Sequence, residues 1–143
     1  MLKNIPSILT PDLLKILMEM GHGDELVIAD GNFPAASHAQ RLVRCDGHGV
    51  PELLEAILTF FPLDQYVQKP VSLMQKAPGD DTPTDIWKDY ERIVKKYESL
   101  EHGFDHVERF AFYDKTKEAY AIVATGETAL YANIILKKGV VIT

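Results

Sequence analysis

Cysteine, positive charge and long hydrophobic runs are all scarce in this sequence. Cys45 is the only cysteine among 143 residues, so the chain cannot close an internal disulfide, which fits a reducing compartment. The 15 Lys and Arg residues are outnumbered by 21 Asp and Glu residues, which gives a net charge of −6. This balance argues against nucleic acid or an anionic membrane as the main partner, because both require a basic surface. The longest apolar runs, such as 26–29 and 120–124, are far shorter than the roughly 20 residues of a bilayer span.

The residues that are present suit one ordinary domain. Hydrophobic residues make up 46% of the chain, which is enough to bury a core, and the length predicts a single domain over residues 1–143. Met1 to Asn4 is not followed by the hydrophobic region of a signal peptide. Together with the single cysteine, this leads us to expect a cytoplasmic protein.

Helix and strand signals alternate through the first part of the chain. Thr10, Pro11 and Asp12 are typical of a helix start, because they supply a cap, a residue that needs no N–H partner and a negative charge. We expect Gly21 to end this helix in the left-handed conformation. The short apolar run 26–29 predicts a strand that is buried on both faces.

The middle of the chain continues this alternation. Residues 41–45 predict a second strand, and Pro51 begins a helix that Pro62 ends. Residues 71–75 predict a short strand, and 82–85 resembles a capping box that opens a third helix.

The end of the chain predicts three consecutive strands, at 107–113, 120–124 and 134–142, the last with a break near Gly139. In the first, a period of two places Phe110 and Phe112 on one face. Because helices alternate with strands early and strands gather late, we expect a compact α/β fold with a mixed β-sheet covered by helices.

His22 is the first candidate functional residue. It lies between Gly21 and Gly23, after a helix end and before a buried strand, so the backbone can approach a ligand closely. Histidine exchanges protons near neutral pH, which makes His22 a candidate acid/base catalyst. The alternative is a solvated side chain in a turn between helix and strand.

Asp30, Arg109 and Tyr113 are candidates because of their places on predicted strands. A carboxylate that ends a strand next to a glycine often borders a ligand crevice in α/β sheets, although Asp30 also suits a local Asx turn. Arg109 and Tyr113 share the face opposite the phenylalanines, which directs them toward a cleft or a subunit interface. The alternative for Arg109 is an exposed side chain on an edge strand.

Tyr131 and Asn133 precede the last predicted strand. A phenol and an amide two residues apart both donate and accept hydrogen bonds, which suits recognition of sugar hydroxyls. The alternative is that Tyr131 belongs to the core and Asn133 makes a turn.

Metal binding and thiol chemistry are not expected. Nitrogen and oxygen ligands are present in His22, His38, His48, Asp30 and Asp46, but no two histidines have the spacing of a metal site. Cys45 belongs to an apolar predicted strand, where a thiol is usually inert.

Several stretches are distinctive when taken together and in order: Met20 to Glu25, Ala29 to Pro34, Arg44 to Gly47, Arg109 to Tyr113, Thr125 to Asn133 and Leu136 to Val140. In this combination they resemble the fucose-mutarotase and ribose-pyranase family. The resemblance covers nearly the whole chain, and the combination is far more specific than any single stretch.

The resemblance implies an isomerase that interconverts the α and β anomers of L-fucose without metal or organic cofactor. It also implies a ribose-pyranase-like fold and a homodecamer built from rings, with sites near subunit contacts. By motif, His22 corresponds to the proton donor, and Asp30, Arg109, Tyr131 and Asn133 correspond to the sugar-binding residues. We add Tyr113, whose ring could contact the apolar face of a sugar.

Two alternatives remain open at this point. Tyr131-Ala132-Asn133 matches the ribose branch, whereas 109–113 and 32–34 match the fucose branch over a longer stretch. L-Fucose is therefore the leading substrate, and a D-ribose pyranase is the first alternative. The second is a non-catalytic, ring-forming sugar-binding protein.

Overall fold

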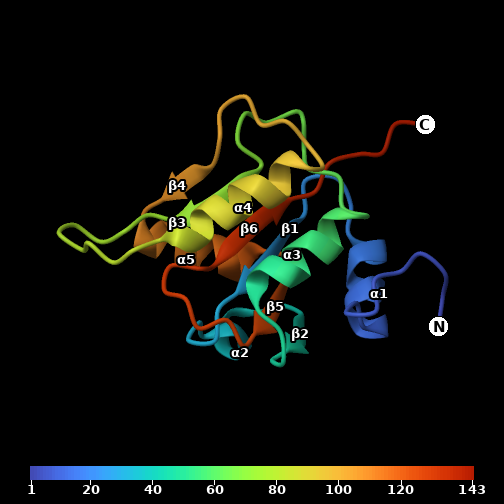
Figure 1. The fold of residues 1–143 in the computed structure, drawn as a ribbon, viewed down its shortest axis with the longest axis horizontal. Coiled ribbons are helices and arrows are strands. Elements are labelled where there is room, and N and C mark those ends of the chain that lie inside the picture. Colours follow the sequence, from blue (N-terminus) through green and yellow to red (C-terminus); the bar gives the residue numbers. More distant parts are fainter.

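A six-stranded sheet with the strand order β2-β5-β1-β6-β3-β4 forms the centre of the molecule. In the computed structural model, which describes residues 1–143, the strands are β1 (Glu25–Ala29), β2 (Leu42–Cys45), β3 (Val71–Met74), β4 (Asp105–Val107), β5 (Ala121–Thr125) and β6 (Ile134–Lys137). β6 is antiparallel to both of its neighbours, β1 and β3, whereas the other pairs are parallel. The predicted mixed sheet is confirmed, with β1 near its middle (Figure 1).

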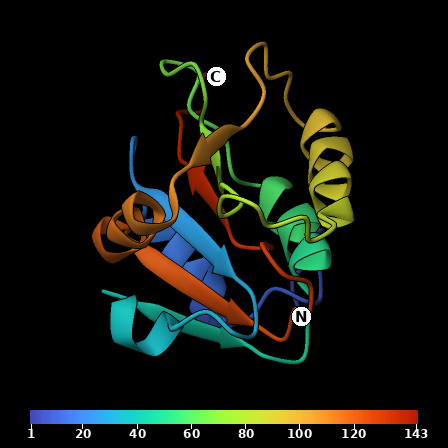
Figure 2. The same cartoon turned by 90° about the vertical axis from the view of Figure 1, so that its left-hand side faces the viewer.

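Helices cover both faces of this sheet. They are α1 (Pro11–Glu19), α2 (Ala35–His38), α3 (Val50–Leu58), α4 (Asp85–Lys95) and α5 (Arg109–Glu118). α3 and α4 lie on one side of the sheet and α2 and α5 on the other (Figure 2). α1 shares a core of 25 buried residues with α3 and α4, and α5 contributes to a second core of ten. The predicted α/β class is confirmed.

The side chains of β1 alternate between these two cores. Leu26 and Ile28 belong to the larger core, and Val27 and Ala29 to the smaller one. All four are inaccessible to solvent, which confirms the predicted strand with two buried faces.

The start of α1 is as predicted, but its end is not. The Thr10 hydroxyl accepts a hydrogen bond of 3.1 Å from the Leu13 N–H, and Pro11 begins the helix. The left-handed glycine is Gly23, with φ of 87°, and not Gly21. The prediction for Gly21 is wrong because Met20 already leaves the helix in an extended conformation, and the chain turns back only at Gly23.

The predicted strand 107–113 is wrong over most of its length. Only Asp105–Val107 is a strand, and α5 begins at Arg109 because the Glu108 side chain accepts hydrogen bonds from the Phe110 and Ala111 N–H groups. Phe112 is fully buried under the sheet, whereas Phe110 is 69% exposed. The spacing of two between Phe110 and Phe112 therefore does not mark the buried face of a strand.

Two smaller expectations also fail. Thr84 precedes α4 but its side chain makes no capping bond, and Thr82 donates its N–H and hydroxyl to Asp80 instead of closing a capping box. The last strand ends at Lys137 rather than at residue 142. The helix at Pro51 is confirmed, although it ends at Leu58 and not at Pro62, and the strand predicted at 71–75 is confirmed over 71–74.

The two ends of β1 lie on opposite edges of the sheet. His22 precedes the strand and Asp30 follows it, and five residues at about 3.3 Å each separate these edges by about 16 Å. None of the helices has the length and hydrophobicity of a membrane span.

Candidate functional site

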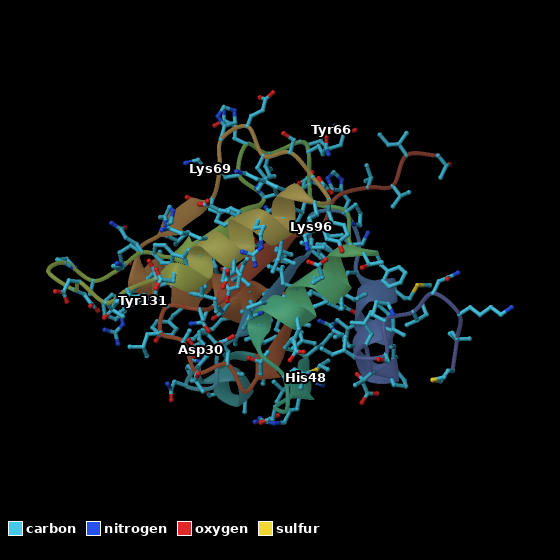
Figure 3. The ribbon with its side chains drawn as sticks, in the orientation of Figure 1. Asp30, His48, Tyr66, Lys69, Lys96 and Tyr131 are labelled. Atoms are coloured by element: carbon cyan, nitrogen blue, oxygen red, sulfur yellow. The ribbon has the colours of Figure 1, made fainter.

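A cleft of about 300 Å³ opens at the edge of the sheet where β1 ends. Five of the six predicted site residues line it: Asp30, Arg109, Tyr113, Tyr131 and Asn133. The cleft also contains five residues that the sequence interpretation missed: Asn32, Phe33, Met74, Asp80 and Leu130. Figure 3 labels Asp30 and Tyr131 at this end of the molecule. The volume of the cleft is at the lower end of the range for small-molecule sites.

The topology explains why residues so far apart in the sequence meet here. β6 is antiparallel to β1, so the loop before β6 lies beside the end of β1. This loop carries Tyr131 and Asn133 to Asp30, and the Asp30 N–H donates a 2.7 Å hydrogen bond to the Asn133 side-chain oxygen. Since that oxygen is occupied, the Asn133 amide nitrogen is left to donate to a ligand.

Asp30 is a nearly buried carboxyl group. It is 8% exposed, and one of its oxygens accepts a 3.0 Å hydrogen bond from the Asn32 N–H, which is the Asx turn considered for this position. Burial raises the pKa of Asp30 above its ordinary value, although hydrogen bonds from backbone N–H groups oppose the shift. The side chain therefore combines a structural turn with a place in the cleft.

Tyr131 has an uncommon backbone conformation that α4 holds in place. Its φ is 56°, in the left-handed region that costs a non-glycine residue about 1–2 kcal/mol. The Trp87 indole N–H donates to the Tyr131 carbonyl at 2.8 Å, and the buried Tyr90 hydroxyl donates to the Ala132 carbonyl at 2.6 Å. Strained residues held in this way are concentrated at functional sites.

α5 supplies the opposite wall of the cleft. Arg109 is its first residue and is exposed, and Tyr113 lies one turn later on the same helix face. The Tyr113 ring stacks on Phe33 with centroids 5.6 Å apart. An exposed arginine and a stacked aromatic pair next to buried polar groups can bind both the hydroxyls and the apolar face of a small polar ring.

His22 lies away from this cleft, at the other edge of the sheet. Its Nε2 atom is 3.0 Å from an oxygen of Asp64, and its ring is 5.4 Å from Tyr66. The His22 side chain is 45% exposed, whereas that of Asp64 is 4% exposed. Within one chain, the structure therefore does not bring the predicted proton donor to the predicted ligand-binding residues.

Asp64 is a partner of His22 that the sequence interpretation missed. Burial would raise its pKa, but hydrogen bonds from the Tyr66 N–H and from His22 outweigh burial and lower the pKa below its ordinary value. A buried, ionised carboxylate fixes the orientation of an imidazole and stabilises its protonated form. No local spacing links position 64 to position 22, so only the tertiary structure reveals this pair.

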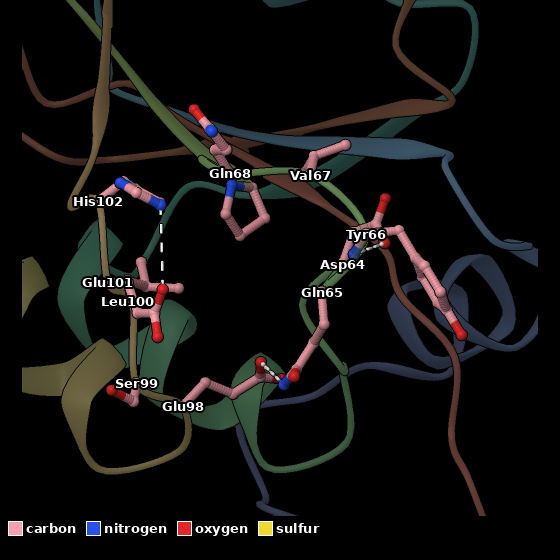
Figure 4. Close-up of a pocket in the computed structure, with 11 residues that line it drawn as sticks. Asp64, Gln65, Tyr66, Val67, Gln68, Glu98, Ser99, Leu100, Glu101 and His102 are labelled. Carbon is pink, nitrogen blue, oxygen red and sulfur yellow. Dashed lines mark hydrogen bonds and ion pairs between the residues drawn. The ribbon is translucent and has the colours of Figure 1, made fainter.

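A second cavity, of about 390 Å³, is lined in part by Asp64, the partner of His22 (Figure 4). It is bounded by the loop 64–70 and by residues 98–102 after α4, and Asp64 and Tyr66 belong to its lining. Glu98 accepts hydrogen bonds there from the Leu63 N–H and the Gln65 side chain. His22 itself is not among the lining residues.

Metal-ligand side chains do not gather anywhere in the structure in groups of three or more. His48 contacts Glu52, and His38 contacts Ser37 close to the rings of Phe33 and Tyr113. The Cys45 thiol is buried, which raises its pKa and makes it a poor nucleophile.

A three-layer α/β fold whose cleft combines a carboxyl group, an amide, a guanidinium and aromatic rings defines a carbohydrate-binding class of protein. Comparison with known proteins specifies the family. The RbsD / FucU transport protein family matches residues 3–141, and the chain belongs to this family.

Relatives with known names cover nearly the whole chain. An L-fucose mutarotase of Actinobacillus pleuropneumoniae serotype 5b is 51% identical over 98% of this chain and 97% of its own. The fucose mutarotase of Homo sapiens is 48% identical over 97% of this chain and 94% of its own. A crystal structure of the fucose mutarotase from Streptococcus pneumoniae in complex with L-fucose has a TM-score of 0.94 and 54% identity, covering 99% of this chain and all of the other.

Proposed function

We propose that this chain is an isomerase that interconverts the α and β anomers of L-fucose. The observation that carries the proposal is the convergence of Asp30, Arg109, Tyr113, Tyr131 and Asn133 on one cleft, in a chain whose close relatives are fucose mutarotases. The cleft also contains apolar side chains from Phe33, Met74 and Leu130. They match the methyl group of L-fucose, which D-ribose lacks, and so favour fucose over ribose.

The cleft residues bind and orient the sugar in this proposal. Arg109 and the free amide nitrogen of Asn133 donate hydrogen bonds to sugar oxygens, and Asp30 accepts one from a hydroxyl. The stacked rings of Tyr113 and Phe33 contact the apolar face of the sugar.

Ring opening requires one proton to reach the ring oxygen and another to leave the anomeric hydroxyl. The bond from the anomeric carbon to the ring oxygen breaks as the carbonyl forms, and one positioned acid/base group is sufficient when it donates the first proton and water accepts the second, because the uncatalysed reaction is already fairly easy. The His22–Asp64 pair has this chemistry, since the imidazole is half-exposed and its carboxylate partner is buried.

We further propose that His22 of one copy completes the cleft of a neighbouring copy. The cleft and the His22–Asp64 pair lie on opposite edges of the sheet, so a contact between them is head-to-tail. Repeated head-to-tail contacts generate closed rings when the rotation permits. This geometry supports the ring-based homodecamer that the family resemblance implies, and we propose that this protein forms the same assembly. We also propose that each chain is a single domain and that the protein is cytoplasmic.

Saturation-transfer proton NMR on the anomeric signals of L-fucose tests the proposed activity. Transfer between the α and β signals should increase in proportion to the added protein and be far weaker with D-ribose. Exchange with D-ribose alone would replace the proposal with a ribose pyranase. Saturable binding of L-fucose by calorimetry, without faster exchange, would leave only a sugar-binding protein.

A further inference from the structure

The phenol of Tyr131 has an unusually complete set of protein partners for a group that borders a ligand cleft. Its hydroxyl donates a hydrogen bond of 2.5 Å to an oxygen of Asp80, and its oxygen accepts one of 3.2 Å from the Ala77 N–H. Asp80 also lines the cleft. The loop between β3 and α4 thus contacts Tyr131, whose left-handed backbone conformation is held in place by α4.

These contacts fix the direction of the phenol hydrogen bond. A phenol has one proton to donate, and the carboxylate of Asp80 can only accept, so the Tyr131 proton is committed to Asp80. The other Asp80 oxygen accepts both the N–H and the hydroxyl of Thr82. The hydrogen bonds from Thr82 and Tyr131 lower the pKa of Asp80 to about 2, so this carboxylate remains ionised at neutral pH.

We propose that Asp80 is a positioning residue that keeps the Tyr131 proton in a hydrogen bond to its own carboxylate, so that the phenol oxygen accepts a hydrogen bond from one hydroxyl of the bound sugar. This inference rests on the proposed function. It makes Asp80 a determinant of specificity, because a sugar with no donor at that position leaves the phenol oxygen with the Ala77 N–H as its one donor.

The substitution Asp80→Asn should reverse this polarity without changing the shape of the loop. The oxygen of the new side-chain amide would accept the two Thr82 donors, which leaves the NH₂ group of that amide next to the phenol oxygen. The amide then donates to Tyr131, and the phenol proton is free to be donated to the bound sugar. Asp81→Asn is the matched control, because Asp81 is an exposed neighbour outside the cleft lining and loses the same charge.

The test compares binding of L-fucose with binding of its 2-, 3- and 4-deoxyfluoro analogues, since fluorine cannot donate a hydrogen bond. In the wild type and in Asp81→Asn, one analogue should bind about tenfold more weakly than L-fucose beyond the loss shared by all three. In Asp80→Asn this excess loss should fall below about threefold, and Tyr131→Phe should abolish it. An identical pattern in the wild type and in Asp80→Asn would overturn the inference.

A measurement without sugar separates this inference from the proposed function. The Raman doublet of tyrosine differs between phenols that donate and phenols that accept, and subtraction of the Tyr131→Phe spectrum isolates Tyr131. The isolated signal should be that of a strong donor in the wild type and should lose this character in Asp80→Asn. An unchanged signal would overturn the role of Asp80, whereas a wild type that neither binds L-fucose nor accelerates its exchange would overturn the proposed function.

Discussion

His22 is the side chain on which the proposed chemistry depends. We expect His22→Ala to reduce the protein-dependent exchange of L-fucose anomers by about 10²–10⁴-fold, because it removes the acid/base group and leaves the cleft intact. Saturation-transfer NMR measures the exchange, and calorimetry should find most of the sugar affinity retained. An unfolded variant, judged by circular dichroism, would instead make His22 a structural residue.

Arg109 should contribute to binding more than to the chemical step. Its side chain is exposed at the start of α5 and lines the cleft, where a guanidinium donates charge-assisted hydrogen bonds. We expect Arg109→Ala to weaken L-fucose binding about tenfold or more, measured by calorimetry. Lys117→Ala, on the exposed end of the same helix, is the control, and equal affinities in the two variants would remove Arg109 from the site.

The nearly buried carboxyl group of Asp30, which lines the cleft, should lower the free energy of unfolding at neutral pH, where it is ionised. Burial raises the pKa of Asp30 in the folded protein above the ordinary value of 3.8. At any pH between the pKa of the unfolded chain and that of the folded protein, the folded protein therefore binds more protons than the unfolded chain. Stability linked to Asp30 is therefore lost as the pH rises through this window.

Asp30→Asn removes the ionisation and should reverse that loss. We expect the melting temperature of the variant, relative to the wild type, to increase as the pH rises above the ordinary pKa of 3.8, and to level off once the pH exceeds the raised pKa of Asp30. The exposed Asp81→Asn should show no such trend. A difference that decreases with pH would mean that hydrogen bonds to the Asp30 carboxylate outweigh its burial.

α4 keeps the loop 131–133 in its functional conformation. Tyr90 is fully buried, its pKa is raised by burial, and its hydroxyl donates to the Ala132 carbonyl. We expect Tyr90→Phe to lower the free energy of unfolding by about 1–3 kcal/mol and to weaken sugar binding, because a buried carbonyl loses its partner.

Urea unfolding and calorimetry measure these two effects. Tyr97→Phe is the control, because the Tyr97 hydroxyl contacts Glu55 on the surface and not the loop. Loss of stability with unchanged sugar affinity would show that α4 supports the core but not the site.

Arg109 and Tyr113 line one cleft as expected, although the predicted strand is in fact the helix α5. Arg109 and Tyr113 share a face in a strand because their separation is even, and they share a face in a helix because it is one turn. Both therefore reach the cleft in either case. The helix itself was not predictable from the aromatic pattern, since Glu108 initiates it and burial of Phe112 and Thr116 orients it.

The whole assembly should be needed for activity if the site is shared between copies. His22→Ala and Asp30→Ala should each be inactive alone, because one lacks the acid/base pair and the other lacks a cleft residue. Co-expression of the two should restore up to about a quarter of the wild-type activity, through sites that combine an intact cleft with an intact His22.

Affinity purification of the co-expressed variants on one tag and then on the other must recover mixed oligomers for this test. Mixed oligomers without restored exchange would contradict a shared site and would require His22 to act within its own chain.

The sequence by itself determined the α/β class, the two buried faces of β1 and the start of α1, because these depend on local hydrophobic patterns and capping. It also identified five residues of the cleft. Only the tertiary structure decided that Asp64 pairs with His22 and that Asp80 accepts a hydrogen bond from the Tyr131 hydroxyl. It also decided that His22 lies at the edge of the sheet opposite the cleft. These facts depend on strand order and on loops that meet across 42 to 51 residues, and no local pattern encodes such contacts.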